Sequence, residues 1–458
     1  MLLKQPWMKG YYDIRTELIQ AEEEGKDISL LKVKADQITD QTNKTAQTEL
    51  ETNILYDKIQ ELPIKDGYQY VEPNTLGGII DQRKYNNIYK ACNKVDFFDR
   101  IYGGWLGRCS GCLLGQPVEG WYHSKIVSLL KDTGNYPIKY YISSDLGEEI
   151  RQKYNITDVG GPYGSKLKNW INNVAYMPED DDTNYTVIAL KLVEDYGIDF
   201  SSDDVAECWL SCLPILHTCT AERMAYINLA NLIMPPQSAI THNPYREWIG
   251  AQIRGDFFGY INPGNPEKAA EMAYRDAAIS HVKNGIYGEM FVAAMIASAF
   301  TTCDPVEIIH SGLSQIPQNS RLYEKINLVL DWKDNCLTEE HVIAEIHKLY
   351  DEMNPHYWTH TVPNAMLVAV GILYGGMDFE KSITLGTVAG FDTDCNSATI
   401  GSIIGIAIGA KNLPEKWITP LNNKLKSGVD GFGLVEISML AERTVALVQK
   451  FDKSQLIG

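Results

Sequence analysis

Four glycines recur at every fourth position of one segment and limit how that segment can fold. Residues 100–120 read RIYGGWLGRCSGCLLGQPVEG, and the spaced glycines are Gly103, Gly107, Gly111 and Gly115. Positions four apart share one face of an α-helix. Because glycine costs about 1 kcal/mol in a helix interior, the stripe predicts a second backbone packed very close to this face. Pro117 ends the helix, and Glu119 follows either as a solvated loop carboxylate or as a group entering a cleft.

Two acidic clusters far apart in the chain lie beside apolar, helix-forming runs. The first is residues 179–183 (EDDDT) and the second is residues 392–396 (DTDCN). Carboxylates beside apolar segments are costly to desolvate without a positive partner, and no Lys or Arg is near either cluster in sequence. Asp and Thr oxygens suit hard cations such as Mg²⁺ and Mn²⁺. We therefore expect both clusters to meet at one site that holds two cations.

The alternative interpretation of these aspartates is helix capping, which is common at helix starts. A cap uses only one side-chain oxygen, whereas three consecutive aspartates repel one another. The two clusters taken together therefore favour a metal site over capping.

Charge and hydropathy exclude several classes of partner. The chain has 458 residues and a formal net charge of −18, which argues against nucleic acid because phosphate binding needs basic patches. The longest apolar runs, such as residues 400–410, are too short to span a bilayer. The first residues lack the apolar core of a signal peptide. We expect a cytoplasmic protein with no membrane partner.

The composition changes along the chain and predicts two parts. Residues 1–92 are rich in polar residues, with apolar positions at helical spacing, and predict a helical extension followed by a loop-rich connector. Residues 93–458 contain no series of alternating strands, so we expect an all-α catalytic domain of many short helices. Residues 125–170 mix Gly, Pro, Tyr and Asn, and predict an irregular excursion or lid.

Four segments, in this order, resemble the ADP-ribosylglycohydrolases: the glycine-rich opening that ends at Glu119, the triplet Asp181–Thr183, the pair Ser280–His281 with the helix after Gly288, and residues 392–396 with the Gly/Ala-rich helix after them. The resemblance implies a compact all-α fold with a two-metal cleft that holds Mg²⁺ or Mn²⁺. It also implies hydrolysis of an N- or O-glycosidic bond at the anomeric carbon of ADP-ribose.

The resemblance also implies roles for particular residues. The expected cation ligands are Asp180, Asp181, Asp182, Asp392 and Asp394. Either Glu119 or Asp182 is expected to transfer the proton. For the ADP-ribose-containing substrate, we expect the backbone at Gly285, Tyr287 and Gly288 to form a nest that takes the phosphates. His281 and Asn364 are expected to contact the substrate as well.

Several positions depart from the family pattern. Asp180 stands where Thr or Ser is usual, Cys395 stands where the second motif has Thr or Ser, and Cys112 replaces an aspartate of the opening helix. Residues 218–224 stand where a glycine-rich substrate loop is expected. Two alternatives to ADP-ribose hydrolysis therefore remain. One is a hydrolase or lyase for another ribosyl or nucleoside compound, and the other is a non-catalytic relative that kept the fold.

Overall fold

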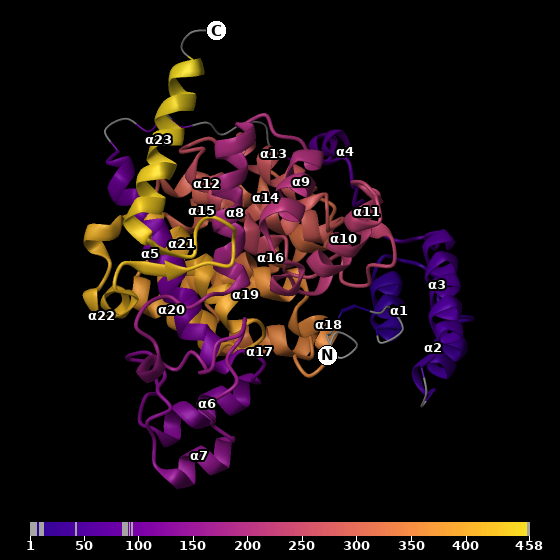
Figure 1. The fold of residues 1–458 in the computed structure, drawn as a ribbon, viewed down its shortest axis with the longest axis horizontal. Helices are drawn as coiled ribbons and strands as arrows, with labels where there is room; N and C mark the ends of the chain where they lie inside the picture. The colour runs from indigo at the N-terminus through magenta and orange to yellow at the C-terminus, as the bar shows by residue number, and fades with distance from the viewer. Residues whose placement is uncertain are drawn as a thin grey trace.

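Two glycine-rich helices lie side by side at the centre of the fold (Figure 1). The computed structural model describes residues 7–8, 13–41, 44–84, 90, 92 and 95–455, and the two helices are α5 (Phe97–Gly115) and α21 (Thr393–Ile408). A β-carbon on any stripe glycine would overlap the backbone of α21; the facing pairs are Gly103 with Gly405, Gly107 with Gly401, Gly111 with Ser397, and Gly115 with Asp394. The contact is reciprocal at Gly401 and Gly405, which face Gly107 and Gly103, and it confirms the close backbone packing that the stripe predicts.

The other helices of the main body surround this pair. Their bounds are α6 (His123–Asp132), α7 (Glu148–Tyr154), α8 (Asp181–Tyr196), α9 (Ser202–Cys212), α10 (Thr220–Ala230), α11 (Gln237–Ile240), α12 (Asp256–Tyr260), α13 (Pro266–Ala277), α14 (Asn284–Ala299), α15 (Pro305–Leu313), α16 (Arg321–Asp334), α17 (Glu339–Leu349), α18 (Pro355–Trp358), α19 (Thr361–Gly375), α20 (Phe379–Val388), α22 (Glu415–Ile418) and α23 (Ile437–Gln455). Short 3-10 helices are η3 (Gln116–Val118), η4 (Ile171–Asn173), η5 (Ile215–His217), η6 (Gln252–Arg254), η7 (Ala410–Asn412) and η8 (Thr419–Leu421).

Local sequence signals explain many of these helix starts. Ser201 and Asp204 form a reciprocal capping box on α9. Asn265 caps α13 and Asp304 caps α15, each followed by a proline in the first turn, where a missing N–H costs nothing. Helices α14 and α19 are apolar on all sides, and every residue of both is buried, as expected for helices in the middle of a core.

The described chain is all-α except for one short hairpin. Strands β1 (Lys424–Lys426) and β2 (Leu434–Glu436) pair antiparallel, and Leu425 is opposite Val435. The predicted excursion at residues 125–170 is irregular at residues 133–147 and 155–170. It also contains helices α6 and α7, which form a lobe below the main body in Figure 1. In the described residues, no helix is both long and apolar enough to cross a membrane.

The extension forms helices α1 (Ile14–Glu23), α2 (Lys32–Thr39), α3 (Ala46–Glu61) and α4 (Leu76–Asp81). The first three share a small apolar cluster of their own, and they lie to one side of the main body in Figure 1. Helix α1 contacts the body through buried ion pairs, such as Arg246 Nη1 to Glu17 Oε2 at 2.5 Å and Arg246 Nε to Glu24 Oε1 at 2.8 Å. The amphipathic helices predicted for this region are therefore present.

The α5–α21 contact generates a stability prediction. Gly107→Ala places a methyl group against the Gly401 carbonyl, and separating two packed backbones is expected to lower the free energy of unfolding by about 3 kcal/mol or more. The measurement is chemical denaturation of the full chain.

Gly77→Ala is the matched control, because Gly77 lies in helix α4 with no atom within 4 Å of its β-position. It is expected to be neutral or stabilising by about 0.5–1 kcal/mol. Equal stability of the two variants would contradict the close contact.

Candidate metal centre

The starts of α8 and α21 bring the two acidic clusters together. Asp180 caps α8, and its Oδ1 accepts a hydrogen bond from the Asp182 amide at 3.0 Å. Gly115, at the end of α5, lies against the backbone of Asp394 in the first turn of α21. As a result, ligand atoms of Cys112, Asp180, Asp182 and Asp394 all lie within 4.8 Å of one another. Predicted residues from both remote clusters therefore share one site.

A second group overlaps the first. Ligand atoms of Asp392, Asp394 and Cys395 also lie within 4.8 Å of one another. Asp392 Oδ1 and Asp394 Oδ1 are buried and have no hydrogen-bond partner among the described residues. Burial, followed by the charges of Glu119 and Asp392, raises the pKa of Asp394 well above its usual value. Buried carboxylate oxygens without partners, in a mainly oxygen donor set, fit divalent cations.

One cation from the chain does reach this site, and the sequence analysis missed it. Arg108 of α5 is fully buried, and its Nη2 lies 3.0 Å from Asp182 Oδ1 while its Nη1 lies 2.9 Å from Asp256 Oδ2. The other oxygen, Asp182 Oδ2, accepts a hydrogen bond from Cys395 Sγ at 3.1 Å. The signal was the one charged residue in residues 101–115, which are otherwise uncharged and mostly small or apolar. Arg108 neutralises part of the acidic charge, and it leaves Asp392 and Asp394 without a cation.

Two further polar side chains, of Tyr163 and Gln116, donate hydrogen bonds to the aspartates at the start of α8. Asp181, half-buried, accepts a hydrogen bond from the Tyr163 hydroxyl at 2.8 Å. Gln116 of η3 donates to Asp180 Oδ2 at 2.5 Å. Neither Tyr163 nor Gln116 was predicted: Tyr163 lies in an irregular segment, and Gln116 follows directly after α5 in η3.

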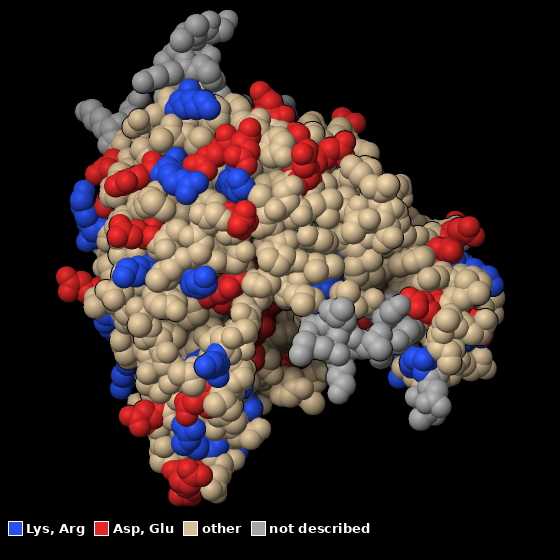
Figure 2. Space-filling view, in the orientation of Figure 1, with Lys and Arg blue, Asp and Glu red and all other residues tan. Residues whose placement is uncertain are grey.

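Glu119 lies directly after η3, on the solvent side of the site. Its side chain keeps an exposed surface, yet it is recessed among protein atoms. This burial, and then the charges of Asp392, Asp180 and Asp181, raise its pKa well above the usual value. Figure 2 shows a hollow between the lobe of α6 and α7 and the main body, with acidic atoms on its inner wall. A carboxyl group with a raised pKa beside further carboxylates is suited to proton transfer.

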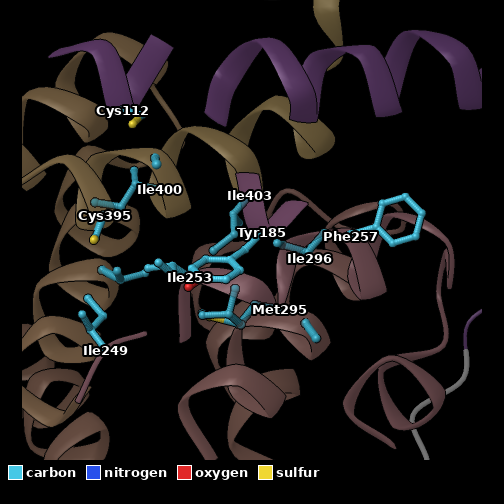
Figure 3. Packing of buried hydrophobic residues seen from close by; sticks show 14 of the residues in the cluster. Cys112, Tyr185, Ile249, Ile253, Phe257, Met295, Ile296, Cys395, Ile400 and Ile403 are labelled. Carbon is cyan, nitrogen blue, oxygen red and sulfur yellow. The ribbon is translucent and has the colours of Figure 1, made fainter. Parts of the chain in front are cut away.

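The two cysteines that depart from the family pattern lie at this site. Figure 3 shows Cys112 and Cys395 at the same end of the apolar core cluster. Burial, followed by neighbouring aspartate charges, raises the pKa of both thiols well above the usual value. Both groups therefore act as small, protonated side chains unless a cation displaces the proton.

The structure corrects the predicted phosphate nest. Gly285, Tyr287 and Gly288 are buried in the first turns of α14. The Asn284 amide at the start of this helix already donates to Glu247 Oε2 at 3.2 Å, and the Tyr287 hydroxyl donates to the Pro73 carbonyl of the connector at 2.6 Å. The two glycines permit close packing, and they leave no open backbone nest for a phosphate.

His281 is also buried in the core. Its Nδ1 lies 2.8 Å from the Ser280 hydroxyl, and that hydroxyl accepts a hydrogen bond from Arg254 Nη1 at 3.0 Å. Burial, followed by the Arg254 charge, lowers the pKa of His281 well below its usual value. His281 therefore belongs to a neutral, structural position rather than to the open face of the site.

Asn364 has a different role from the predicted contact with substrate. It is fully buried, and its Oδ1 accepts hydrogen bonds from the Asp392 amide at 3.2 Å and from Asn396 Nδ2 at 2.8 Å. Asn364 therefore positions the acidic turn before α21.

One protein family matches most of the sequence. The sequence model of the ADP-ribosylglycohydrolase family matches residues 93–455. A solved structure described as an "ADP-ribosylglycohydrolase-related protein complex" is similar to this chain, with a TM-score of 0.47 and 17% identity, over 77% of this chain and 98% of that chain. No curated protein matches the sequence. Since the family match spans most of the sequence, the chain belongs to the ADP-ribosylglycohydrolases, a family of glycohydrolases.

Proposed function

We propose that this chain is a metal-dependent hydrolase that cleaves a glycosidic bond at the anomeric carbon of ADP-ribose. The product would be ADP-ribose released from a modified protein or small molecule. The observation that carries the proposal is the meeting of two remote acidic clusters at one site, where buried carboxylate oxygens lack partners beside Glu119.

Two divalent cations, Mg²⁺ or Mn²⁺, would be held by the five predicted aspartates: Asp180, Asp181, Asp182, Asp392 and Asp394. When bound, such cations bind hydroxyl groups of a sugar and lower the pKa of a water molecule. Cys395 lies among these donors, and a sulfur donor favours Mn²⁺ over Mg²⁺.

Glu119 is the better candidate for proton transfer. Its raised pKa favours the protonated carboxyl group, which would give its proton to the leaving nitrogen or oxygen as the glycosidic bond breaks. It can then take a proton from the attacking water. Asp182 is less suited, because Arg108 binds one of its oxygens and Cys395 donates to the other.

The substrate could instead be another ribosyl or nucleoside compound, and one observation favours this second candidate. Residues 218–224 replace the glycine-rich loop that the family resemblance implies, and they lie beside the site. Cys219 Sγ is 4.0 Å from the Tyr163 hydroxyl, which in turn donates to Asp181.

The hydrolysis experiment uses the full chain with Mn²⁺, on one N-linked and one O-linked ADP-ribosyl peptide and on free nucleosides. Wild-type protein is expected to release ADP-ribose from at least one peptide. Glu119→Gln is expected to lower kcat about 10²-fold to 10⁴-fold while the protein stays folded, because general acid–base groups contribute about that much. Chromatography of released ADP-ribose measures the rate.

Glu148→Gln, on the exposed surface of α7, is the control and is expected to keep full activity. Release of ribose from nucleosides alone would favour the second candidate. Full activity of Glu119→Gln would remove Glu119 from the reaction.

Replacing Asp394 tests two properties separately: the stability of the protein without metal, and the binding of Mn²⁺. With EDTA present at pH 8, Asp394→Asn is expected to melt at or above the wild-type temperature, because it removes a buried charge that faces other carboxylates. Mn²⁺ is expected to raise the melting temperature of the wild type by mass action, and to leave that of the variant nearly unchanged. Equal Mn²⁺-induced shifts in scanning calorimetry would contradict the role of Asp394 as a ligand.

A further inference from the structure

The extension places one carboxylate against two histidines of the main body. Glu23 ends α1, and its Oε2 lies 3.2 Å from His356 Nε2 and 3.5 Å from His360 Nε2. Arg321 Nη1 is 3.5 Å from the same oxygen. His356 and His360 are both at least 98% buried. A single oxygen of the extension is therefore the meeting point of three groups from the body.

The three side chains could be taken for a metal site, since their ligand atoms lie within 4.8 Å of one another, but the histidine tautomers argue against it. His356 Nδ1 accepts a hydrogen bond from Trp248 Nε1 at 3.2 Å, and an indole nitrogen can only donate. His360 Nδ1 accepts from the Val362 amide at 3.1 Å. Each neutral ring must therefore carry its proton on Nε2, where a cation ligand would need a lone pair.

His356 therefore donates its Nε2–H to Glu23 Oε2, whereas His360 Nε2 lies 3.5 Å from the same oxygen and makes no hydrogen bond among the described residues. Burial raises the pKa of Glu23, but the hydrogen bond from His356 and the charge of Arg321 oppose it, and the pKa is lowered. Glu23 is therefore held as a carboxylate beside the two rings.

The backbone that carries these histidines also holds the acidic turn of the candidate metal centre. His360 caps α19, and its carbonyl accepts a hydrogen bond from Asn364 Nδ2 at 2.9 Å. Asn364 Oδ1 in turn accepts from the Asp392 amide. In parallel, Trp358 Nε1 donates to the Phe391 carbonyl at 2.7 Å. Two hydrogen bonds thus join residues 356–364 to the backbone directly at Asp392.

Phe391 needs this support, because its φ of +55° lies in the left-handed region, which is unfavourable for a bulky side chain. The turn is kept by surrounding contacts rather than by its own preference. The hydrogen bonds from residues 356–364 are therefore among the contacts that hold the turn at Asp392.

We propose that Glu23 is a positioning residue for the candidate metal centre, acting through His360 and Asn364 on the turn at Asp392. The extension thereby helps to position the site, although none of its described residues contributes a ligand. Of this inference, only the expected change in cation affinity rests on the proposed function. The coupling between Glu23 and the turn is a property of the chain itself.

The test compares Glu23→Gln with Glu17→Gln in the full-length chain. Glu17 lies on the same helix and is equally bound to an arginine, but it contacts Arg246 and neither histidine. Hydrogen exchange followed by mass spectrometry, without metal, is expected to show faster exchange at residues 354–364 and 391–396 for Glu23→Gln only. Glu17→Gln is expected to change exchange only near α1 and Arg246.

Isothermal titration with Mn²⁺ is the second measurement. Glu23→Gln is expected to weaken Mn²⁺ binding about tenfold, as outer-shell changes do, and Glu17→Gln to leave it unchanged. Glu23→Asp, which keeps the charge, is expected to fall between Glu23→Gln and wild type. If Glu23→Gln did not fold, Glu23→Asp against Glu17→Asp gives the same comparison.

Three results would overturn the proposal: unchanged exchange at 391–396 in Glu23→Gln, equal changes there in both variants, or an unchanged affinity for Mn²⁺. Absence of Mn²⁺ binding in the wild type would instead count against the proposed function, and the exchange comparison would still decide the coupling.

Discussion

The backbone contact between α5 and α21 is the constraint on which the rest of the structure depends. Glycines on both helices remove the side chains that would otherwise separate them, so the spacing is set by backbone atoms that cannot change rotamer. The last contact of the series joins Gly115 to Asp394. Glu119 lies just beyond the end of α5, and Asp392 just before the start of α21. One packing contact therefore fixes both halves of the candidate site.

The distribution of positive charge separates the candidate site from the other buried acidic groups. Glu222, Asp276 and Glu289 each lie within 3.5 Å of Arg254, so each carboxylate of that network has an arginine beside it, although the Glu289 oxygens accept no hydrogen bond among the described residues. At the candidate site, only Asp182 contacts an arginine. No described lysine or arginine lies within ion-pair distance of Asp392 or Asp394. The same residue types thus surround an arginine in one place and leave two buried aspartates without one in the other.

The glycine stripe and the α-helical class were predicted from spacing along single elements, and the meeting of the two acidic clusters from the cost of burying like charges. Contacts without such a signal were missed: Arg108 of α5 reaches Asp182 at the start of α8, and Glu247, from a segment of turns, closes the start of α14. Asn364 was chosen as a site residue, and its position near the site is right, but its partner is the backbone rather than a ligand.

The ion pairs of α1 are better understood as fixing a position than as supplying stability. Desolvation offsets most of the Coulomb energy of a buried pair, whereas an unpaired buried charge is costly. Helix α1 and its C-cap present three carboxylates to the body: Glu17 and Glu24 both contact Arg246, and Glu23 contacts His356. Any shifted docking would leave at least one of them without its partner. The ion pairs therefore destabilise other docked positions of α1 more than they stabilise the native one. A helix that sets the geometry of a distant turn needs such a fixed position.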